Sequence, residues 1–161
     1  MAEKIFAGMS YEQVLHKYAD TVAGVCVMRL RNYADAEDCF QNTFIKLFQK
    51  SPDFMNENHL KAWLIRVAIN ECRNYINMNR RFVPLSAAKY ETVELKENEN
   101  DISWAMLQVE PKYREVLYLF YCEGYKVNEI SDILGKNPNT VKTLLKRGRE
   151  KLRKAYGGDE I

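Results

Sequence analysis

Residues 127–148 have the sequence VNEISDILGKNPNTVKTLLKRG, in which two amphipathic patterns flank a short polar stretch. Val127, Ile130, Ile133 and Leu134 repeat at helical spacing and predict a short first helix. Gly135 follows, as expected where the backbone needs a positive φ. Asn137 and Pro138 then suit the cap and first position of a second helix. The stretch therefore predicts a helix-turn-helix, whose second helix can enter a major groove of DNA.

The second of these helices has one apolar and one polar face. The apolar pattern turns inward Val141, Leu144 or Leu145, Gly148 and Leu152. Side chains suited to bases and phosphates remain mostly outward: Asn139, Thr140, Lys142, Thr143, Lys146 and Arg147. Residues 136–154 carry eight basic side chains and one acidic one, which favours a local polyanion site. The alternative is a helical hairpin with a solvated, charged face.

A longer helix is expected upstream, over about residues 60–80. Its predicted buried stripe is Leu60, Leu64, Val67, Ala68, Cys72, Tyr75 and Ile76. A polar stripe also recurs at steps of three and four, namely Arg66, Asn70, Arg73, Asn77 and Arg81. Basic and amide groups on one face suit a nucleic-acid backbone and exposed base edges, although a solvated face explains them equally well. Trp63, near the boundary of the stripes, is either a core residue or a platform for an unpaired base.

Two earlier helices complete the N-terminal half. The first is expected to start at a capping box, Ser10-x-x-Gln13, and to bury Val14, Leu15, Tyr18, Val22, Val25 and Cys26. The second is expected to start near Asp35, with Glu37 and Asp38 in its first turn, where carboxylates suit the helix dipole. It ends before Ser51, and residues 51–58 form a polar loop.

Residues 82–101 lose helical periodicity and turn acidic, with five acidic side chains against one basic one over 91–101. Such a stretch predicts a flexible tether between domains. Helices are expected again over 102–109 and from Pro111 onward. The predicted fold is therefore all-α, with two small helical domains, 8–81 and 102–157, joined by the acidic linker 82–101, and a helix-turn-helix in the second domain.

The sequence also argues against a metal-binding protein, a secreted protein and a membrane protein. The four cysteines are scattered, without a CxxC pair, and His16 and His59 lie far from them, so no metal site is expected. The cysteines are expected to be reduced, buried and apolar in behaviour. The chain shows no secretory signal and no apolar run of membrane-spanning length, so a cytoplasmic location without membrane insertion is expected.

Three stretches resemble the extracytoplasmic-function (ECF) group of bacterial RNA polymerase sigma factors. Residues 36–44, AEDCFQNTF, are similar to that group's Ala-Glu-Asp-x-x-Gln-Glu-Thr-Phe stretch, with Asn42 in place of its usual carboxylate. Residues 61–70, KAWLIRVAIN, are similar to its Ala-Trp-Leu-x-Arg-Ile-Ala-x-Asn stretch. Residues 129–143 resemble its C-terminal helix-turn-helix, although Asn139 and Leu144 replace a common Gly and a common Arg.

The resemblance implies a sigma factor that binds core RNA polymerase and promoter DNA, without a cofactor. Docking on the clamp helices of the β′ subunit, alongside contacts with the β subunit, would involve Asp35, Asp38, Gln41, Asn42 and Phe44. The −10 element would be melted and recognised by Asn58, Lys61, Trp63, Arg66, Asn70, Arg73, Asn74, Asn77, Arg80 and Arg81. The −35 duplex would be bound by Asn137, Asn139, Thr140, Lys142, Thr143, Lys146 and Arg147. In this family a flipped −10 base enters a pocket partly formed by the 51–58 loop, and an anti-sigma factor often holds the protein.

Two other classes of protein, a free-standing DNA-binding regulator and an enzyme, account for fewer features of the sequence. A free-standing helix-turn-helix regulator explains residues 126–153 but leaves the Arg66–Arg81 stripe and the tether without a role, and no dimerisation helix is evident. An enzyme would need a phosphate loop, a metal cluster or a nucleophile–base pair, and none is evident. Glu37 and Asp38 point about 100° apart on a helix, so they do not converge on one substrate atom.

Overall fold

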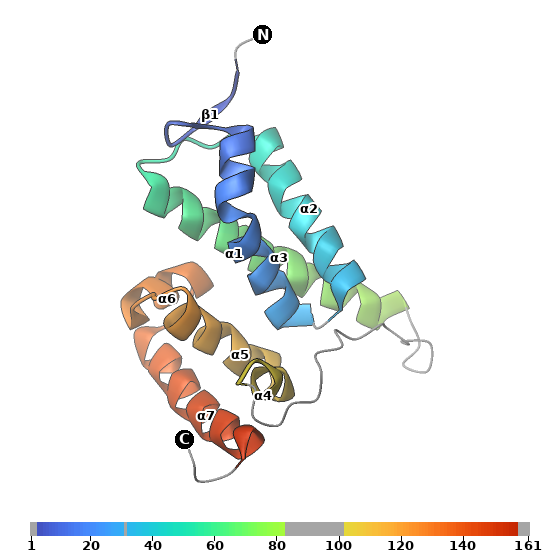
Figure 1. Ribbon diagram of the computed structural model, residues 1–161, viewed down its shortest axis with the longest axis vertical. Helices are drawn as coiled ribbons and strands as arrows, with labels where there is room; N and C mark the ends of the chain where they lie inside the picture. The colour runs from blue at the N-terminus through green and yellow to red at the C-terminus, as the bar shows by residue number, and fades with distance from the viewer. Residues whose placement is uncertain (1–2, 31, 83–101, 158–161) are drawn as a thin grey trace. The chain divides into compact units, whose positions relative to one another are not determined.

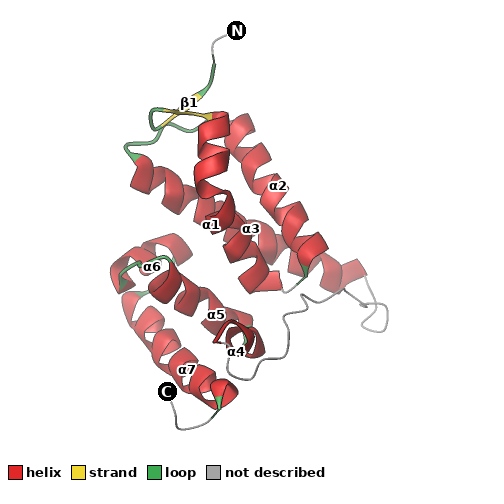
Figure 2. Cartoon of the chain, viewed as in Figure 1, coloured by secondary structure: helices red, strands yellow, loops and turns green. Residues whose placement is uncertain are grey.

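The computed structural model describes residues 3–30, 32–82 and 102–157, with the side chains of 79–82 and 102–104 left out (Figure 1). The chain forms two compact units, one on each side of residues 83–101, and both are built from helices (Figure 2). The predicted two-part all-α fold is therefore confirmed. The proposed acidic linker lies, apart from Phe82, outside the described residues. Among those residues, no helix is both long enough and apolar enough to cross a membrane.

In the first unit, three long helices pack so that each contacts the other two: α1 (Tyr11–Leu30), α2 (Tyr33–Lys50) and α3 (Glu57–Phe82). Each helix contributes to one core, which includes the fully buried side chains Val14, Val22, Leu47, Leu60, Leu64 and Ile65. Amphipathic stripes on three helices thus bury one another, which explains why residues distant in sequence fold as one body.

The start of α1 confirms the predicted capping box. The Ser10 backbone N–H donates to Gln13 Oε1 at 2.8 Å, and the Gln13 N–H donates to Ser10 Oγ at 3.2 Å. A small hairpin that the sequence did not predict precedes it, pairing β1 (Ile5–Phe6) with β2 (Met9–Ser10). Its turn has a positive φ at both central residues, Ala7 and Gly8, as hairpin turns of this length require. The hairpin matters because it places Phe6, 1% exposed, in the core.

Helix α2 begins two residues earlier than predicted. Asn32 is its N-cap, and the Asn32 Oδ1 accepts a hydrogen bond from the Asp35 N–H at 3.1 Å. Asp35 therefore lies in the first turn, whereas Glu37 and Asp38 lie one turn later, and their predicted position in the first turn is wrong. Asn is a preferred capping residue, so the capping signal is present in the sequence at Asn32.

Three of the four cysteines are buried as predicted, one from each helix of the first unit: Cys26, Cys39 and Cys72. Hydrogen bonding with Cys72, together with burial, raises the pKa of the Cys39 thiol, so this thiol stays protonated and behaves as a small apolar group. The prediction is wrong for Cys122, which is exposed. It is the last residue of a short π-helix, Tyr118–Cys122, in which Leu119 is buried and Tyr121 and Cys122 are exposed.

The second unit contains α4 (Ile102–Gln108), α5 (Pro111–Leu117), the π-helix η2 (Tyr118–Cys122), α6 (Val127–Leu134) and α7 (Pro138–Tyr156). Pro111 occupies the first turn of α5, as predicted. Helix α7 has 19 residues and packs against α4, α5 and α6. At Gly148 helix α7 packs closely on α5, since a Cβ built on this glycine would lie 3.2 Å from Leu117 Cδ1 and 3.3 Å from Tyr113 Cβ.

Candidate nucleic-acid and protein interfaces

The turn between α6 and α7 is closed by its own polar groups. Gly135 ends α6 with a φ of +65°, the left-handed conformation that glycine adopts without a Cβ penalty. The Lys136 N–H donates to the Ser131 carbonyl at 3.1 Å, and the Ser131 hydroxyl donates back to the Lys136 carbonyl. Asn137 then caps α7, its Oδ1 accepting from the Asn139 N–H at 2.8 Å. The predicted helix-turn-helix is confirmed in its turn and in this cap.

Lys126 precedes α6 as its N-cap. The Lys126 backbone N–H donates to Glu129 Oε1 at 2.9 Å, which satisfies one of the amides at the helix start. An ammonium group accepts no hydrogen bond, so the lysine side chain leaves the other half of a capping box unmade.

Helix α7 divides its side chains between core and solvent as the sequence predicted. The buried residues are Val141, Leu145, Gly148 and Leu152, whereas Leu144 is half-buried, so Leu145 rather than Leu144 faces the core. The predicted outward residues are all exposed, namely Asn139, Thr140, Lys142, Thr143, Lys146 and Arg147. Asn137 is exposed as well.

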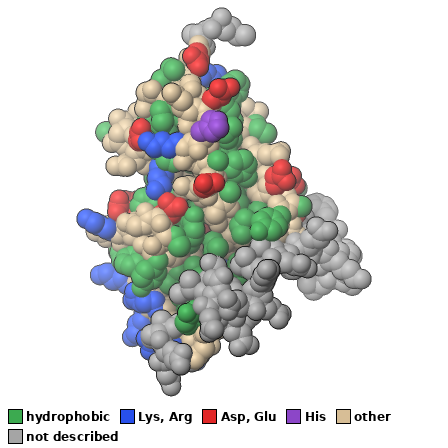
Figure 3. Space-filling view, in the orientation of Figure 1, with side chains coloured by type: hydrophobic (Ala, Val, Ile, Leu, Met, Phe, Trp, Pro, Cys, Tyr) green, Lys and Arg blue, Asp and Glu red, His purple; other side chains and the backbone are tan. Residues whose placement is uncertain are grey.

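Cations on α7 fall into two groups. Lys151 donates to Glu110 Oε1 at 2.8 Å, and Arg149 donates to the Tyr121 hydroxyl at 3.2 Å. By contrast, within the described part of the chain no hydrogen bond or ion pair involves the side chains of Lys142, Lys146 or Arg147. Lys and Arg side chains gather along the edge of the second unit that α7 forms (Figure 3). The three cations on the outward face are thus available to an external polyanion.

Helix α3 also separates core from polar side chains. Leu60, Leu64, Ala68 and Cys72 are buried as predicted, together with Ile65 and Ile69, which were not predicted, while Val67, Tyr75 and Ile76 are half-buried. On the polar side, Arg66, Asn70, Asn74 and Asn77 are exposed, and Lys61 and Arg73 are half-buried. The side chains of Arg80 and Arg81 lie outside the described residues. A row of basic and amide groups therefore follows α3 over at least three turns.

The loop before α3 is shorter than predicted and folds onto the helix. Asn56 caps α3, its Oδ1 accepting from the His59 N–H at 2.9 Å, so the loop ends there and Asn58 lies in the first helical turn. The Phe54 ring packs edge-on against His59 and Trp63, with ring centroids 5.2 and 5.7 Å apart. Trp63 is half-buried, and the Phe54 ring of the loop is one of its neighbours.

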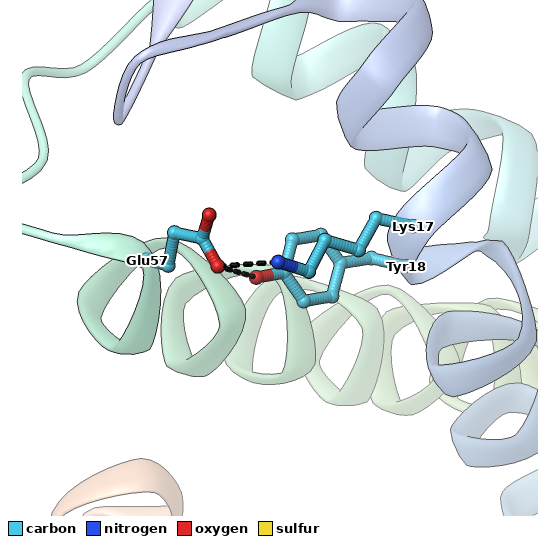
Figure 4. A network of polar contacts seen from close by, with 3 residues as sticks. All are labelled: Lys17, Tyr18 and Glu57. Atoms are coloured by element: carbon cyan, nitrogen blue, oxygen red, sulfur yellow. Dashed lines mark hydrogen bonds and ion pairs between the residues drawn. The ribbon is translucent and has the colours of Figure 1, made fainter.

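A polar contact ties the start of α3 to α1 (Figure 4). Lys17 Nζ lies 2.5 Å from Glu57 Oε2, and the Tyr18 hydroxyl donates to the same oxygen at 3.4 Å. The hydrogen bond from Lys17 lowers the pKa of the Glu57 carboxyl and raises the pKa of Lys17. Burial, followed by the Glu57 charge, raises the pKa of Tyr18. The carboxylate thus orients the residues that follow the loop.

This contact predicts a pH dependence. Because the pKa of Glu57 is lowered in the folded chain from its ordinary value of 4.5, its stabilising contribution is present above that value and is lost as the pH falls through the lowered pKa. A ¹³C NMR titration of the Glu57 carboxyl is expected to give a midpoint below 4.5. In Lys17→Met the midpoint should return to the ordinary value. An unchanged midpoint in that variant would mean that Lys17 does not hold the carboxylate.

Helix α2 presents a second candidate surface, for protein rather than DNA. Asp38, Gln41 and Asn42 are exposed on one face, and Gln41 Nε2 donates to Glu37 Oε1 at 3.5 Å. The same face continues at helical spacing with two exposed apolar side chains, Ile45 (47%) and Phe48 (49%). The sequence contained that signal, since positions 38, 41, 42, 45 and 48 follow steps of three and four, but it was not recognised.

Two predicted docking residues have other surroundings. Phe44 is 3% exposed, and its ring lies 5.0 Å from that of Phe40, so its prediction as a direct contact is corrected: it supports the face from the core. The half-buried Asp35 accepts a hydrogen bond from the Tyr75 hydroxyl of α3. Lys46 and the largely buried Glu71 form a second contact between α2 and α3. Helices α2 and α3 are therefore joined by polar contacts as well as by the core.

Both units match known family models. Residues 14–82 match the model described as sigma-70 region 2, and residues 101–152 match the one described as sigma-70, region 4. The RNA polymerase sigma factor CarQ of Myxococcus xanthus is 27% identical over 161 residues, which cover 94% of this chain and 92% of CarQ. The ECF RNA polymerase sigma factor SigW of Bacillus subtilis is 28% identical over 164 residues, covering 90% of this chain and 88% of SigW.

Solved structures share the fold. The sigma factor RpoE of Bartonella quintana, in complex with the anti-sigma factor NepR, has a TM-score of 0.76 and 21% identity, covering 93% of this chain and 98% of that one. CnrH, in complex with the cytosolic domain of CnrY, has a TM-score of 0.65 and 22% identity, covering 93% of this chain and 89% of CnrH.

Proposed function

The chain belongs to the ECF group of sigma-70 factors, which direct RNA polymerase to promoters, and from this premise we propose how its two domains divide the work. The first domain, residues 8–81, binds the polymerase and the melted −10 element. The second, residues 102–157, binds the −35 element as duplex. The acidic segment 82–101 joins them.

Recognition of the −35 element is proposed for the outward face of α7. The observation that carries this proposal is that Lys142, Lys146 and Arg147 are exposed and unpaired there, beside Asn139 and Thr140 at the start of the helix. Cations bind phosphates, and amide and hydroxyl groups near a helix N-terminus can contact base edges in a major groove. Asn137 and Thr143 belong to the same face.

Recognition of the −10 element is proposed for the polar side of α3. Amide and guanidinium groups on adjacent turns suit a strand whose phosphates and base edges are both accessible after melting. The proposed residues are Asn58, Lys61, Trp63, Arg66, Asn70, Arg73, Asn74 and Asn77, with Arg80 and Arg81 added from the sequence resemblance. The edge-on contact between Phe54 and Trp63 supports a role for Trp63 at the loop side of this surface.

Docking on the β′ clamp helices of the polymerase is proposed for the exposed face of α2. Asp38, Gln41 and Asn42 supply its polar contacts, while Asp35 and Phe44 act indirectly, through Tyr75 and through the core. The family resemblance adds contacts with the β subunit. We further propose that the protein catalyses no reaction itself, acts in the cytoplasm, and is held by an anti-sigma factor, as the sigma factor RpoE is in its complex with NepR.

Two substitutions test the division of labour within the first domain. Arg73→Ala is expected to slow open-complex formation about tenfold, because a hydrogen bond to a charged group contributes about 1.5 kcal/mol, while affinity for core polymerase stays unchanged. Gln41→Ala is expected to weaken binding to core polymerase, and to slow initiation only at limiting protein concentration. Permanganate reactivity of the −10 thymines measures melting, and fluorescence anisotropy measures polymerase binding.

Equal loss of melting and of polymerase binding in Arg73→Ala would contradict the assignment of α3. Thermal unfolding of both variants serves as the control, because Arg73 also makes contacts within the protein. Arg73→Lys keeps the charge and should recover part of the melting rate, although lysine lacks the planar two-pronged geometry of arginine.

A further inference from the structure

The loop before α3 exposes an apolar side chain, Met55, to solvent. Met55 is 89% exposed, more than any other large hydrophobic side chain that the structure describes. Its neighbour Phe54 is half-buried and packs on two rings of α3. The loop therefore turns one apolar residue inward and presents the next one outward.

A histidine fixes that arrangement. The Met55 backbone N–H donates to His59 Nδ1 at 3.1 Å. An imidazole nitrogen accepts a hydrogen bond only when it carries no proton, so the neutral ring has its hydrogen on Nε2. The His59 ring also packs edge-on against Phe54. The His59 side chain thus contacts the Phe54 ring and also accepts a hydrogen bond from the Met55 backbone amide.

The hydrogen bond from the Met55 N–H to His59 is a variant of the capping box found at helix N-termini. Asn56 is the N-cap and accepts from the His59 N–H, as the first half of a capping box requires. In a usual capping box a Glu or Gln at the His59 position accepts from the N–H of the cap itself. Here the imidazole instead accepts from the N–H of Met55, one residue before the cap. The bond therefore fixes the loop tip as well as the helix end.

We propose that His59 is a positioning residue, which holds the loop in the shape that presents Met55 to an unpaired base of the −10 element. This inference rests on the proposed −10 function of α3. The surface around Met55 favours a nucleobase, since the loop tip packs on Trp63 and α3 continues with the exposed Arg66 and Asn70. An apolar side chain inserted beside an unstacked base replaces the stacking that melting removes. Holding the loop in advance reduces the ordering required on binding.

Two substitutions separate the two roles of His59. His59→Phe keeps an aromatic ring and removes the acceptor, whereas His59→Gln removes the ring and supplies an acceptor suited to the N–H of the cap, Asn56. In the free full-length protein, exchange of the Met55 amide hydrogen, measured by NMR, is expected to be about tenfold faster in His59→Phe. It should be faster in His59→Gln as well, because a glutamine at this position accepts from the Asn56 N–H and leaves the Met55 N–H without its acceptor.

The functional readout uses the same chains with core polymerase. His59→Phe is expected to slow open-complex formation three- to tenfold and to weaken base preference at one −10 position, with polymerase binding unchanged. His59→Gln should show a similar defect, because completing the cap of α3 does not fix the Met55 amide. Met55→Ala should reproduce the promoter defect while leaving neighbouring loop amides protected, and adding it to His59→Phe should cause little further loss.

Unchanged Met55 exchange in His59→Phe would overturn the proposal, because the bond would then not fix the loop. Faster exchange with normal melting and base preference would also overturn it, and would leave the proposed −10 function standing. Failure of that function itself is a separate result: the wild-type protein would then melt no promoter with core polymerase, whatever the state of the loop.

Discussion

Replacing Lys142, Lys146 and Arg147 together with alanine is expected to remove most of the salt dependence of −35 binding. Each phosphate contact releases about 0.9 counterions, so three lost contacts lower the slope of log affinity against log salt by about 2.7. Between 50 and 200 mM salt, a slope difference of that size amounts to about 40-fold in affinity. The reason is structural, since these cations lie on the outward face of α7 without partners among the described residues.

The chain offers a control with the same change in charge. Arg149, Lys151 and Arg153 lie further along α7, where Arg149 contacts Tyr121 and Lys151 contacts Glu110. Their triple alanine variant is expected to change the slope by less than one, through long-range attraction alone. The measurement is fluorescence anisotropy of the holoenzyme on a −35 duplex over a salt series. Equal slopes for the two triple variants would mean that α7 binds DNA through its total charge and not through one face.

Gly148→Leu is expected to unfold or loosen the second unit. A Cβ at this position already lies 3.2 Å from Leu117 Cδ1, tighter than most real contacts, so a leucine forces α5 and α7 apart. Adding side-chain atoms to a packed interior destabilises by about 1–3 kcal/mol, a large fraction of the stability of a small domain. The consequence is functional as well, since α7 carries the proposed −35 contacts and α5 supports it.

Hydrogen exchange measured by mass spectrometry provides an internal control for this variant. Exchange should accelerate in peptides of α5 and α7 and stay unchanged in peptides of α1, α2 and α3, because the two units have separate cores. Gly148→Ala should have a small effect, since the gain in helix propensity of about 1 kcal/mol opposes the tight contact. Unchanged exchange in Gly148→Leu would mean that α5 and α7 do not approach closely in solution.

The helix-turn-helix was predictable because several independent local signals coincide there. Gly135 supplies the turn, Asn137 the cap, and the Val141–Leu145 spacing the buried face. Each acts within a few residues, so sequence periodicity and capping rules are sufficient. The outward residues of α7 follow from the same pattern, which is why all of those predicted are exposed.

The remaining features depend on contacts between distant residues. Asp35 contacts Tyr75, which is 40 positions away, and Glu57 contacts Lys17 at the same separation, so neither partner can be derived from local spacing. Phe44 belongs to a sequence motif that does not distinguish a surface residue from a supporting one. The sequence around His59 does not indicate its contact with the Met55 N–H, because this contact depends on the path of the loop backbone.

The hairpin at the N-terminus escaped prediction for a different reason. Its strands have two residues each, too few to show an alternating pattern, and Ala7 is an unusual residue at positive φ. Its effect on the core comes from the single residue Phe6.

Run-off transcription from a randomised promoter library, with core polymerase in the presence and absence of this protein, tests the central claim most directly. We expect initiation that depends on the protein, at sequences sharing two elements with the spacing of −10 and −35 sites. The variant with alanine at Lys142, Lys146 and Arg147 should lose selection of the upstream element while retaining the downstream one. A core polymerase that is active on a control template, yet initiates at no shared sequence when the protein is added, would contradict the account.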